Sequence, residues 1–305
     1  MTPTNPTAAR GAARANAVET PSASPEIRTL ETSVGTLQYY ETGAGAPLLF
    51  VHGLFTNMHL WRKIVPELSR DYRCIVPTLP FGAHSVPVRD DVDLSPPALA
   101  GLLFEIIAGL GLKDVTLLAN DTGGALTQLA LAERPDHPAI AGAIFTNCDA
   151  FEVFPPARFL YLRWISYLPL IPTLLAWQMR FDIVRRLPIA LGGLTKYRLS
   201  RESLEEYAGP FSKNARIRNN TTKIMRDIHP RYTRAAAKKL SSFRRPVLLA
   251  WAPEDKLFPL RLAEGLNDLF AESEIKLVAD SGAFIPEDQP AALIAIVREF
   301  KATRA

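Results

Sequence analysis

Cysteine is scarce in this sequence: the chain of 305 residues contains two, Cys74 and Cys148. Both fall within apolar stretches that we expect to form buried strands, where a thiol acts as a small core side chain. A disulfide framework is therefore not expected, and a reducing compartment fits the composition. The sequence accordingly predicts a cytoplasmic protein.

Long apolar runs are missing as well. The uncharged run from Trp164 to Met179 holds 16 residues and is interrupted by Pro169 and Pro172, so it is too short and too broken to span a bilayer. Residues 1–26 contain no aromatic residue and no apolar run. They predict a disordered tail and lack the apolar core of a secretory signal.

The net charge is small, +4 at pH 7, but it is unevenly distributed. The segment Lys196–Arg245 contains 14 Lys or Arg residues against 4 Asp or Glu residues. Such a segment can attract an acidic partner, an anionic substrate or a phospholipid surface, and peripheral membrane contact is left open. The ordinary interpretation is a solvated helical face. No nucleic-acid-binding motif is present, and the oligomeric state is not indicated.

What the sequence does contain is a regular alternation of apolar strands and helices. The hydrophobic fraction of 48% allows a sizeable core, and we expect one large α/β domain with an insertion. The alternation predicts a parallel sheet covered by helices, with ligands bound beyond the carboxyl ends of the strands. The expected elements are a hairpin over residues 27–42, strands at Pro47–Val51, Tyr72–Pro77, Ile140–Asn147, Pro246–Trp251 and Glu274–Val278, a strand that begins at Thr116, and helices at His59–Ser69 and Ser95–Leu110.

The stretch around Asp121 carries the clearest chemical signal. A short apolar strand runs into a turn and a helix, and the small residues Ala119 and Gly123 lie two positions before and after Asp121. This is the layout of a nucleophile elbow, with a carboxylate in place of the serine. An ionised carboxylate needs no base and can attack an electrophilic carbon to leave an ester on the enzyme. The alternative is an ordinary helix N-cap, in which Asp121 accepts the N–H of Gly123 or Gly124.

A His-Gly pair, His52 and Gly53, follows the first long apolar strand. Backbone N–H groups at such a strand end can face the nucleophile and bind a developing oxyanion. We expect Leu54 or Phe55 to supply one of these N–H groups and Thr122 to supply the other. His52 itself is interpreted as a brace for the loop.

These features resemble a known superfamily. Leu49–Gly53, Trp61, the elbow and the segments Pro246–Pro259 and Asp280–Pro290 are similar to the α/β-hydrolases, specifically to the Asp-nucleophile branch that contains haloalkane dehalogenases and epoxide hydrolases. The resemblance implies an α/β-hydrolase fold: a mostly parallel eight-stranded sheet covered by helices, with a helical lid inserted after the sixth strand. It implies no cofactor and no metal.

The resemblance also implies a division of the chain. Residues 27–148 and 241–305 would form the core, and residues 149–240 would form the lid. The first half of the lid carries Leu, Ile, Trp and Tyr on nearly every face, and we interpret much of this as packing of the lid on the core. An apolar lid underside predicts a hydrophobic small-molecule substrate.

The two C-terminal segments hold the remaining catalytic candidates that the resemblance implies. Asp255 takes the place of the triad acid, with Glu254 as its neighbouring candidate and Asp149 as a third, since some relatives draw their acid from there. Relatives place the catalytic histidine seven residues before the proline that opens the last helix, and that position is Ala283. No histidine follows His229, for which we expect a local structural role.

The missing imidazole has a defined consequence. Ester formation on Asp121 stays available, whereas ester hydrolysis loses a general base that typically contributes about 10²–10⁴-fold. Replacing imidazole by the methyl group of Ala283 predicts a polar gap between Asp121 and Asp255 that can hold a water. Asp255 can then act on that water, or the two carboxylates can share a proton as an acid/base pair.

Departures from the two named enzyme groups bear on the substrate. Haloalkane dehalogenases usually grip the halide with residues at the positions of Leu54 and Thr122, so a dedicated halide site is not expected here. Epoxide hydrolases typically carry proline at the position of Phe55 and use lid tyrosines to protonate the epoxide oxygen. The lid tyrosines of this chain that are candidates are Tyr161, Tyr167 and Tyr197.

Three functions therefore compete. The first is a hydrolase-like enzyme that acts on a small hydrophobic substrate with Asp121 as nucleophile. The second is a non-hydrolytic acid/base enzyme that uses Asp121 and Asp255 for isomerisation, elimination or cyclisation. The third is a scaffold that binds an apolar ligand without turnover. The presence of the elbow, the oxyanion loop and the acid loop argues against the third function, and the first is favoured over the second.

Overall fold

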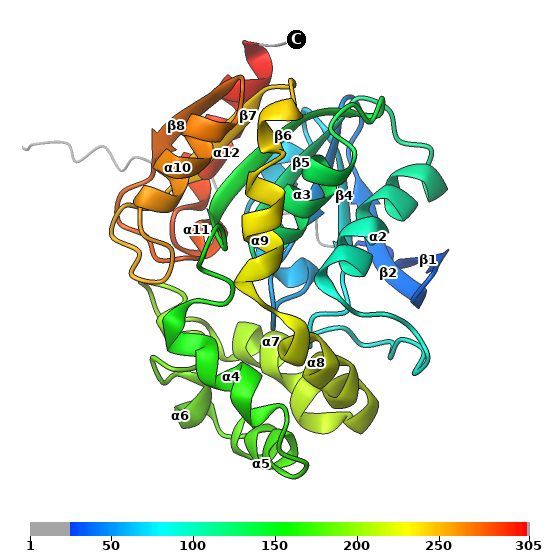
Figure 1. Cartoon of the computed structure of the whole chain (residues 1–305), viewed down its shortest axis with the longest axis vertical. Helices are drawn as coiled ribbons and strands as arrows, with labels where there is room; N and C mark the ends of the chain where they lie inside the picture. The colour runs from blue at the N-terminus through cyan, green and yellow to red at the C-terminus, as the bar shows by residue number, and fades with distance from the viewer. Residues whose placement is uncertain (1–24, 304–305) are drawn as a thin grey trace, which may run out of the picture.

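Eight strands form one continuous sheet in the computed structural model, which describes residues 25–303 (Figure 1). Most of the predicted disordered tail, residues 1–26, lies outside the described residues. The strand order is β1-β2-β4-β3-β5-β6-β7-β8. The strands are β1 (Arg28–Thr32), β2 (Gly35–Thr42), β3 (Pro47–Val51), β4 (Arg73–Thr78), β5 (Val115–Asp121), β6 (Ile140–Cys148), β7 (Val247–Trp251) and β8 (Ser273–Leu277).

The sheet is mostly parallel, as predicted. β2 pairs antiparallel with both β1 and β4, and every other neighbouring pair is parallel. Every residue of β3, β5 and β7 is buried, which explains why these strands are continuous apolar runs and not alternating ones. Cys74 and Cys148 are free, buried thiols in this core.

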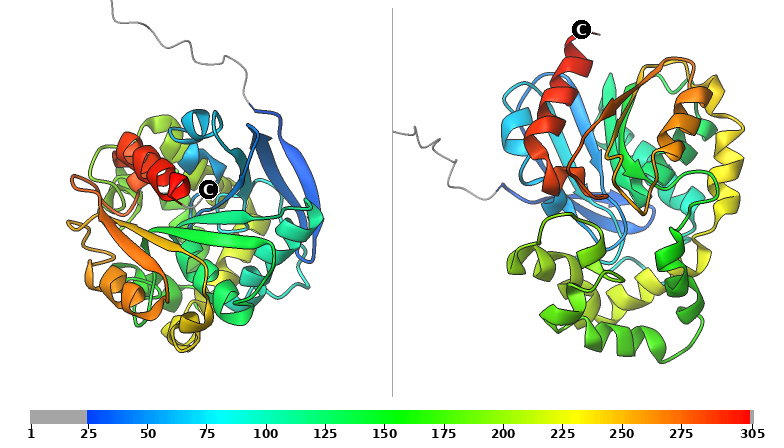
Figure 2. Two further views of the ribbon diagram at one scale, coloured as in Figure 1. Left: turned by 90° about the horizontal axis from the view of Figure 1, so that it is seen from above. Right: turned by 90° about the vertical axis from the view of Figure 1, so that its left-hand side faces the viewer.

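Helices cover both faces of the sheet. α2 (Pro96–Gly109), α3 (Thr122–Glu133), α9 (Pro230–Ala237) and α10 (Arg261–Leu269) lie on one face, and α1 (Val65–Leu68) and α12 (Pro290–Ala302) lie on the other (Figure 2). The short helix α11 (Ile285–Asp288) precedes α12. Because β3 to β8 run parallel, their carboxyl ends all meet at one edge, the edge that faces the lid.

One predicted helix is wrong in its extent. The expected helix His59–Ser69 is two short segments, η1 (Met58–Trp61) and α1, with Pro66 in the first turn of α1. A helix running through Pro66 would lose a backbone hydrogen bond, because proline has no N–H. The helix Ser95–Leu110 is found as α2, and Ser95 caps it by accepting the N–H of Ala98.

A helical lid is inserted between β6 and β7. It contains α4 (Leu160–Ile165), α5 (Ile171–Gln178), α6 (Asp182–Arg185), α7 (Arg201–Lys213) and α8 (Ala215–Asp227), with the single turns η2 (Ala157–Phe159) and η3 (Leu191–Gly193) between them. These helices lie together beyond the carboxyl ends of the strands (Figure 1). α9, which falls within the range predicted for the lid, packs instead against α3 of the core, and η4 (Leu240–Ser242) follows it.

The lid differs from expectation in how it uses its apolar residues. We interpreted much of its apolar first half as packing on the core, yet many of its large apolar side chains are exposed. Within residues 25–303, no helix is both long enough and apolar enough to cross a membrane.

Candidate active site

Asp121 lies at the turn between β5 and α3, in a backbone conformation that only a few non-glycine residues adopt. Its φ is 56° and its ψ is −134°, and such a conformation persists only where the surrounding structure enforces it. The turn is also tight. A Cβ atom at Gly123 would lie 2.2 Å from the carbonyl oxygen of Val51, and one at Gly53 would lie 2.3 Å from Oδ1 of Asp121. Glycine at both positions therefore permits the turn and the approach of the His-Gly loop.

The carboxylate of Asp121 accepts the N–H of Thr122, which donates to Oδ1 at 2.6 Å. The backbone N–H of Leu54 is close enough to this carboxylate to lower its pKa. Of the two expected oxyanion-loop donors, Phe55 is unavailable, because its N–H donates to the carbonyl of Phe81 at 2.7 Å. Burial raises the pKa of Asp121, and the N–H donors oppose this shift. The N-cap bonds expected from Gly123 or Gly124 are not the ones formed, since the cap donor is Thr122.

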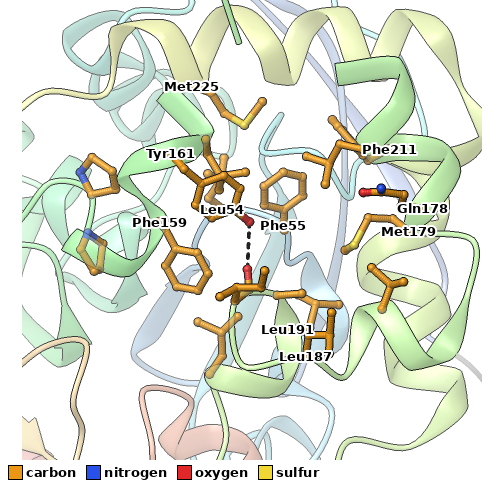
Figure 3. A pocket seen from close by; sticks show the side chains of 18 of the residues that line it. Leu54, Phe55, Phe159, Tyr161, Gln178, Met179, Leu187, Leu191, Phe211 and Met225 are labelled. Carbon is orange, nitrogen blue, oxygen red and sulfur yellow. Dashed lines mark hydrogen bonds between the residues drawn. The ribbon is translucent and has the colours of Figure 1, made fainter. Parts of the chain in front are cut away.

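Asp121 opens into a cavity of about 530 Å³ between the core and the lid (Figure 3). Its polar lining residues are Asp121, Thr122, Asp149, Tyr161, Arg163 and Gln178. The others are aliphatic, aromatic, methionine or proline, and Figure 3 shows Leu54, Phe55, Phe159, Phe211 and Met225 among them. A cavity of this size and lining suits a hydrophobic small molecule.

Asp149 is the second carboxylate of this cavity. It is 1% exposed, and the Thr122 hydroxyl donates to its Oδ2 at 3.3 Å. Its Oδ1 is buried with no hydrogen-bond partner among the described residues. Burial, and next the charge of Asp121, raise the pKa of Asp149 well above its ordinary value. Thr122 thus bridges two carboxyl groups through its N–H and its hydroxyl, and the proton shared by such a pair is favoured on Asp149.

Asp255, the expected triad acid, lies in the loop that follows β7. Its carboxylate accepts the N–H of Leu257 at 2.9 Å, the N–H of Phe258 at 3.3 Å and the side-chain amide of Asn147 at 2.9 Å. Burial raises its pKa to about 6, against the effect of these donors. It does not line the cavity. These contacts hold Asp255 in the loop after β7, and the charge of Asp121 also raises its pKa. The expected pairing of Asp255 with Asp121 across a shared water stays a prediction.

The position of the missing histidine is closed. Ala283 is fully buried and does not line the cavity. Its carbonyl accepts the side-chain N–H of Asn120 at 2.8 Å, and the next N–H, of Phe284, donates to the carbonyl of Leu194 in the lid at 3.0 Å. The predicted gap next to Ala283 is therefore not part of the cavity that Asp121 faces. Glu254 is exposed and accepts the N–H of Asp280 at 3.2 Å. It does not line the cavity.

No histidine replaces the missing one. None of the chain's five histidines, all within the described residues, lines the cavity. His52 accepts the N–H of Leu79 at 2.7 Å through Nε2, and burial lowers its pKa to about 4, so it is a neutral brace for the loop. His229 caps α9 by accepting the N–H of Arg231 at 3.0 Å.

The three lid tyrosines that were candidates differ in whether they line the cavity. Tyr161 lines the cavity, although its hydroxyl donates to the carbonyl of Ile189 at 2.9 Å. Tyr167 and Tyr197 do not line it, and their hydroxyls donate to the Arg226 carbonyl and to Asp280. Within residues 25–303, no cluster of three or more His, Cys, Asp or Glu side chains is arranged to hold a metal ion.

Comparison with known proteins agrees with this fold. The model of the α/β-hydrolase fold family matches residues 46–290. The chain belongs to the α/β-hydrolase fold family. Among solved structures, this α/β-hydrolase is similar to an α/β-hydrolase fold protein from Burkholderia ambifaria, with a TM-score of 0.75 and 21% identity over 90% of this chain and 100% of that one.

Two curated relatives indicate the chemistry found nearby in the family. Haloalkane dehalogenase 2 of Mycobacterium tuberculosis is 25% identical over 280 residues, which are 90% of this α/β-hydrolase and 94% of that protein. Cis-3-alkyl-4-alkyloxetan-2-one decarboxylase of Shewanella oneidensis is 25% identical over 275 residues, 87% of this chain and 84% of that one. The chain is thus related both to enzymes that displace a halide and to one that decarboxylates a four-membered lactone.

Proposed function

We propose that this α/β-hydrolase uses Asp121 as a nucleophile and forms an ester with a small hydrophobic electrophile. The observation that carries the proposal is the position of the Asp121 carboxylate: it stands on a strained elbow, accepts the N–H of Thr122, lies near the N–H of Leu54 and lines an apolar cavity. A carboxylate so placed attacks carbon without prior deprotonation.

Asp149 is the proton-handling partner in this proposal, in place of Asp255. It lines the same cavity, is linked to Asp121 through Thr122, and has one carboxyl oxygen without a hydrogen-bond partner in residues 25–303. As a neutral acid, Asp149 gives its proton to the oxygen that leaves the substrate while Asp121 bonds to carbon. Esterification removes the negative charge of Asp121, and with it one cause of the raised pKa of Asp149. Asp149 is then a carboxylate able to accept a proton.

Hydrolysis then closes the cycle. Water adds to the carbonyl carbon of the Asp121 ester and gives a proton to Asp149, which passes it to the departing alcohol oxygen. The pair ends with the single proton with which it began. Water is consumed, and one carbon–oxygen bond of the ester is broken.

A second candidate is a release step that needs no water. It is favoured by the absence of imidazole from the cavity and by the relationship to an oxetanone decarboxylase. Asp121 attacks the saturated ring carbon that is bonded to the ring oxygen of a four-membered lactone. The bond between that carbon and the ring oxygen breaks, and the ring opens to a free carboxylate. Loss of carbon dioxide then forms a carbon–carbon double bond and expels the Asp121 carboxylate. Neither step requires a general base, so the absence of a histidine does not slow this route.

Intact mass spectrometry tests the nucleophile. The protein is incubated with 1-bromoalkanes, terminal alkyl epoxides and dialkyl four-membered lactones, and peptide mapping locates any added mass. The proposal expects an adduct on Asp121 with at least one class, transient or retained. Absence of both an adduct and product with every class would refute it and leave an apolar-ligand-binding protein.

A further inference from the structure

The lid exposes an unusual amount of apolar surface. Of the fourteen large apolar or aromatic side chains that are exposed within the described residues, eleven fall between Leu160 and Ile189. Six of these do not line the cavity: Leu160, Trp164, Tyr167, Leu168, Leu170 and Leu174. Five also line it: Trp177, Phe181, Ile183, Leu187 and Ile189. These eleven residues are the lid face.

The lid face comes from α4, α5, α6 and the turns between them, at the end of the molecule opposite α12 (Figure 1). The exposed fraction reaches 79% for Leu170 and 76% for Ile183. Isolated exposed apolar residues are ordinary, but a concentration of them on one element marks an interaction surface. Elsewhere in the described residues, only Ile27, Tyr197 and Leu277 are large apolar or aromatic side chains that are exposed, so composition alone does not explain the exposure.

Basic residues border the lid face without carboxylate partners. The guanidinium of Arg163 lies 5.8 Å from the ring centre of Trp164, and that of Arg226 lies 5.6 Å from the ring centre of Tyr167. Arg180 is exposed within the face. None of these three arginines has a carboxylate within salt-bridge distance in the part of the chain that is described. The one acidic residue of the face region, Asp182, is shared by two arginines, Arg185 and Arg201, at 3.5 Å.

We propose that the lid face docks on an anionic phospholipid surface. The arginines have no carboxylate partner among the described residues, although Arg163 and Arg226 each donate to a backbone carbonyl. Apolar and aromatic side chains next to such arginines match a bilayer interface, where acyl chains receive the apolar groups and phosphates receive the guanidinium groups. A second copy of this chain is a poorer occupant. In a two-fold contact through the same face, Arg163, Arg180 and Arg226 would meet like charges.

Docking in this manner also defines how substrate arrives, a consequence that rests on the proposed function. The five shared residues make the apolar lining of the cavity continuous with the lid face. A molecule dissolved in the acyl region can therefore reach Asp121 without crossing bulk water. The substrate class indicated is a membrane-partitioned apolar electrophile.

Tryptophan fluorescence tests the docking directly, because the four tryptophans divide into two classes. Trp164 and Trp177 lie in the lid face at 64% and 54% exposure, whereas Trp61 and Trp251 are fully buried. Titration with vesicles of phosphatidylcholine and phosphatidylglycerol should shift the emission to the blue, and the protein should sediment with the vesicles. Vesicles of phosphatidylcholine alone should bind the protein at least roughly tenfold more weakly, because they carry no net negative charge to attract the arginines.

A double variant, Leu168→Ser with Leu170→Ser, removes two exposed side chains that do not line the cavity. It should weaken vesicle binding roughly tenfold or more. Leu277→Ser is the matched control, since Leu277 is 57% exposed on β8, away from the lid. It should bind vesicles like the unmodified protein.

Two outcomes overturn the inference. One is the absence of vesicle binding by the unmodified protein. The other is a dimer in sedimentation experiments that the double variant dissociates, which would assign the lid face to a second copy. Asp121→Asn should bind vesicles normally, so vesicle binding by the unmodified protein without any adduct on Asp121 and without product would refute the proposed function and leave the docking intact.

Discussion

The side-chain N–H of Asn120 donates to the backbone carbonyl of Ala283 at 2.8 Å. The residue that precedes Asp121 thus holds the loop around Ala283. Asn120 is fully buried and also donates to the Thr146 hydroxyl at 2.8 Å. This arrangement makes the loop around Ala283 a fixed part of the core and not an empty catalytic position.

Removing this link should destabilise the fold. Asn120→Ala leaves the Ala283 carbonyl buried without its donor, which we expect to lower the free energy of unfolding by about 1–3 kcal/mol. Urea denaturation measures the change. Asn57→Ala, in which a buried asparagine that does not line the cavity loses its contacts to Ala83 and Glu206, is a control for the general cost of removing a buried amide. Unchanged stability of Asn120→Ala would show that the link contributes nothing.

Much of the site could be predicted from the sequence because it depends on local patterns. The elbow at Asp121, the N–H of Thr122 and the burial of the central strands follow from small-residue spacing and apolar runs within a few residues. Asn120 was missed, although a polar residue at the end of an otherwise apolar strand, directly before the nucleophile, was a usable signal.

Other parts depend on contacts between distant segments. The sequence placed Asp255 in its loop, but it did not predict that Asn147 on β6 donates to its carboxylate together with the N–H groups of Leu257 and Phe258. The exposure of the lid face was likewise beyond the sequence, since the same apolar pattern fits a lid packed on its core. Short helices bury whichever side the tertiary structure covers.

Asp121 should be required for any covalent chemistry. Asp121→Asn replaces the carboxylate by an uncharged amide of the same shape, and we expect adduct formation and turnover to fall at least about 10³-fold. The comparison is with Asp255→Asn, which should retain the adduct while losing stability. Mass spectrometry of both variants after incubation with the same electrophiles measures the amount of adduct on each. Equal labelling of Asp121→Asn and the unmodified protein would remove Asp121 from the mechanism.

The raised pKa of Asp149 predicts that the stability of the folded protein depends on pH. Its pKa is raised in the folded protein, so the folded state holds a proton that the unfolded state releases above about pH 4. Stability is therefore lost as the pH rises from about 4 through the raised pKa. Asp149→Asn removes this loss and should become more stable than the unmodified protein, by on the order of 1–3 kcal/mol, at pH 8 but not at pH 3.5. Thermal unfolding at several pH values measures it.

The same variant separates stability from function. Asp149→Asn should still form the Asp121 ester with an alkyl bromide, whose leaving halide needs no proton, but should lose most of its reactivity with epoxides, whose oxygen does need one. If both substrates reacted as with the unmodified protein, Asp149 would have no role in proton transfer. Single-turnover rates with each electrophile provide the comparison.

Restoring the histidine should be difficult, because the position is closed. Ala283 has no exposed surface, so Ala283→His should cost about 1–3 kcal/mol of stability through overpacking. Where the variant folds and the side chain reaches the ester, release of an Asp121 adduct should accelerate, since an imidazole base is typically worth about 10²–10⁴-fold. Ala283→Gln, similar in size but unable to act as a base, is the control. Equal release by the two variants would contradict a rate-limiting ester hydrolysis.

Labelled water distinguishes the two proposed release steps. In the hydrolytic route, water oxygen enters the carboxyl group of Asp121, because water attacks the carbonyl carbon of the ester. A single turnover in ¹⁸O-water should then add the label to the peptide that contains Asp121. In the decarboxylative route, the bond between Asp121 and the substrate carbon breaks without water, so Asp121 stays unlabelled while carbon dioxide and an alkene appear. The apolar cavity and the absence of histidine from it are compatible with both routes. Product formed without either label or carbon dioxide would exclude both and point to direct attack on the substrate by water, with Asp121 acting as a general base.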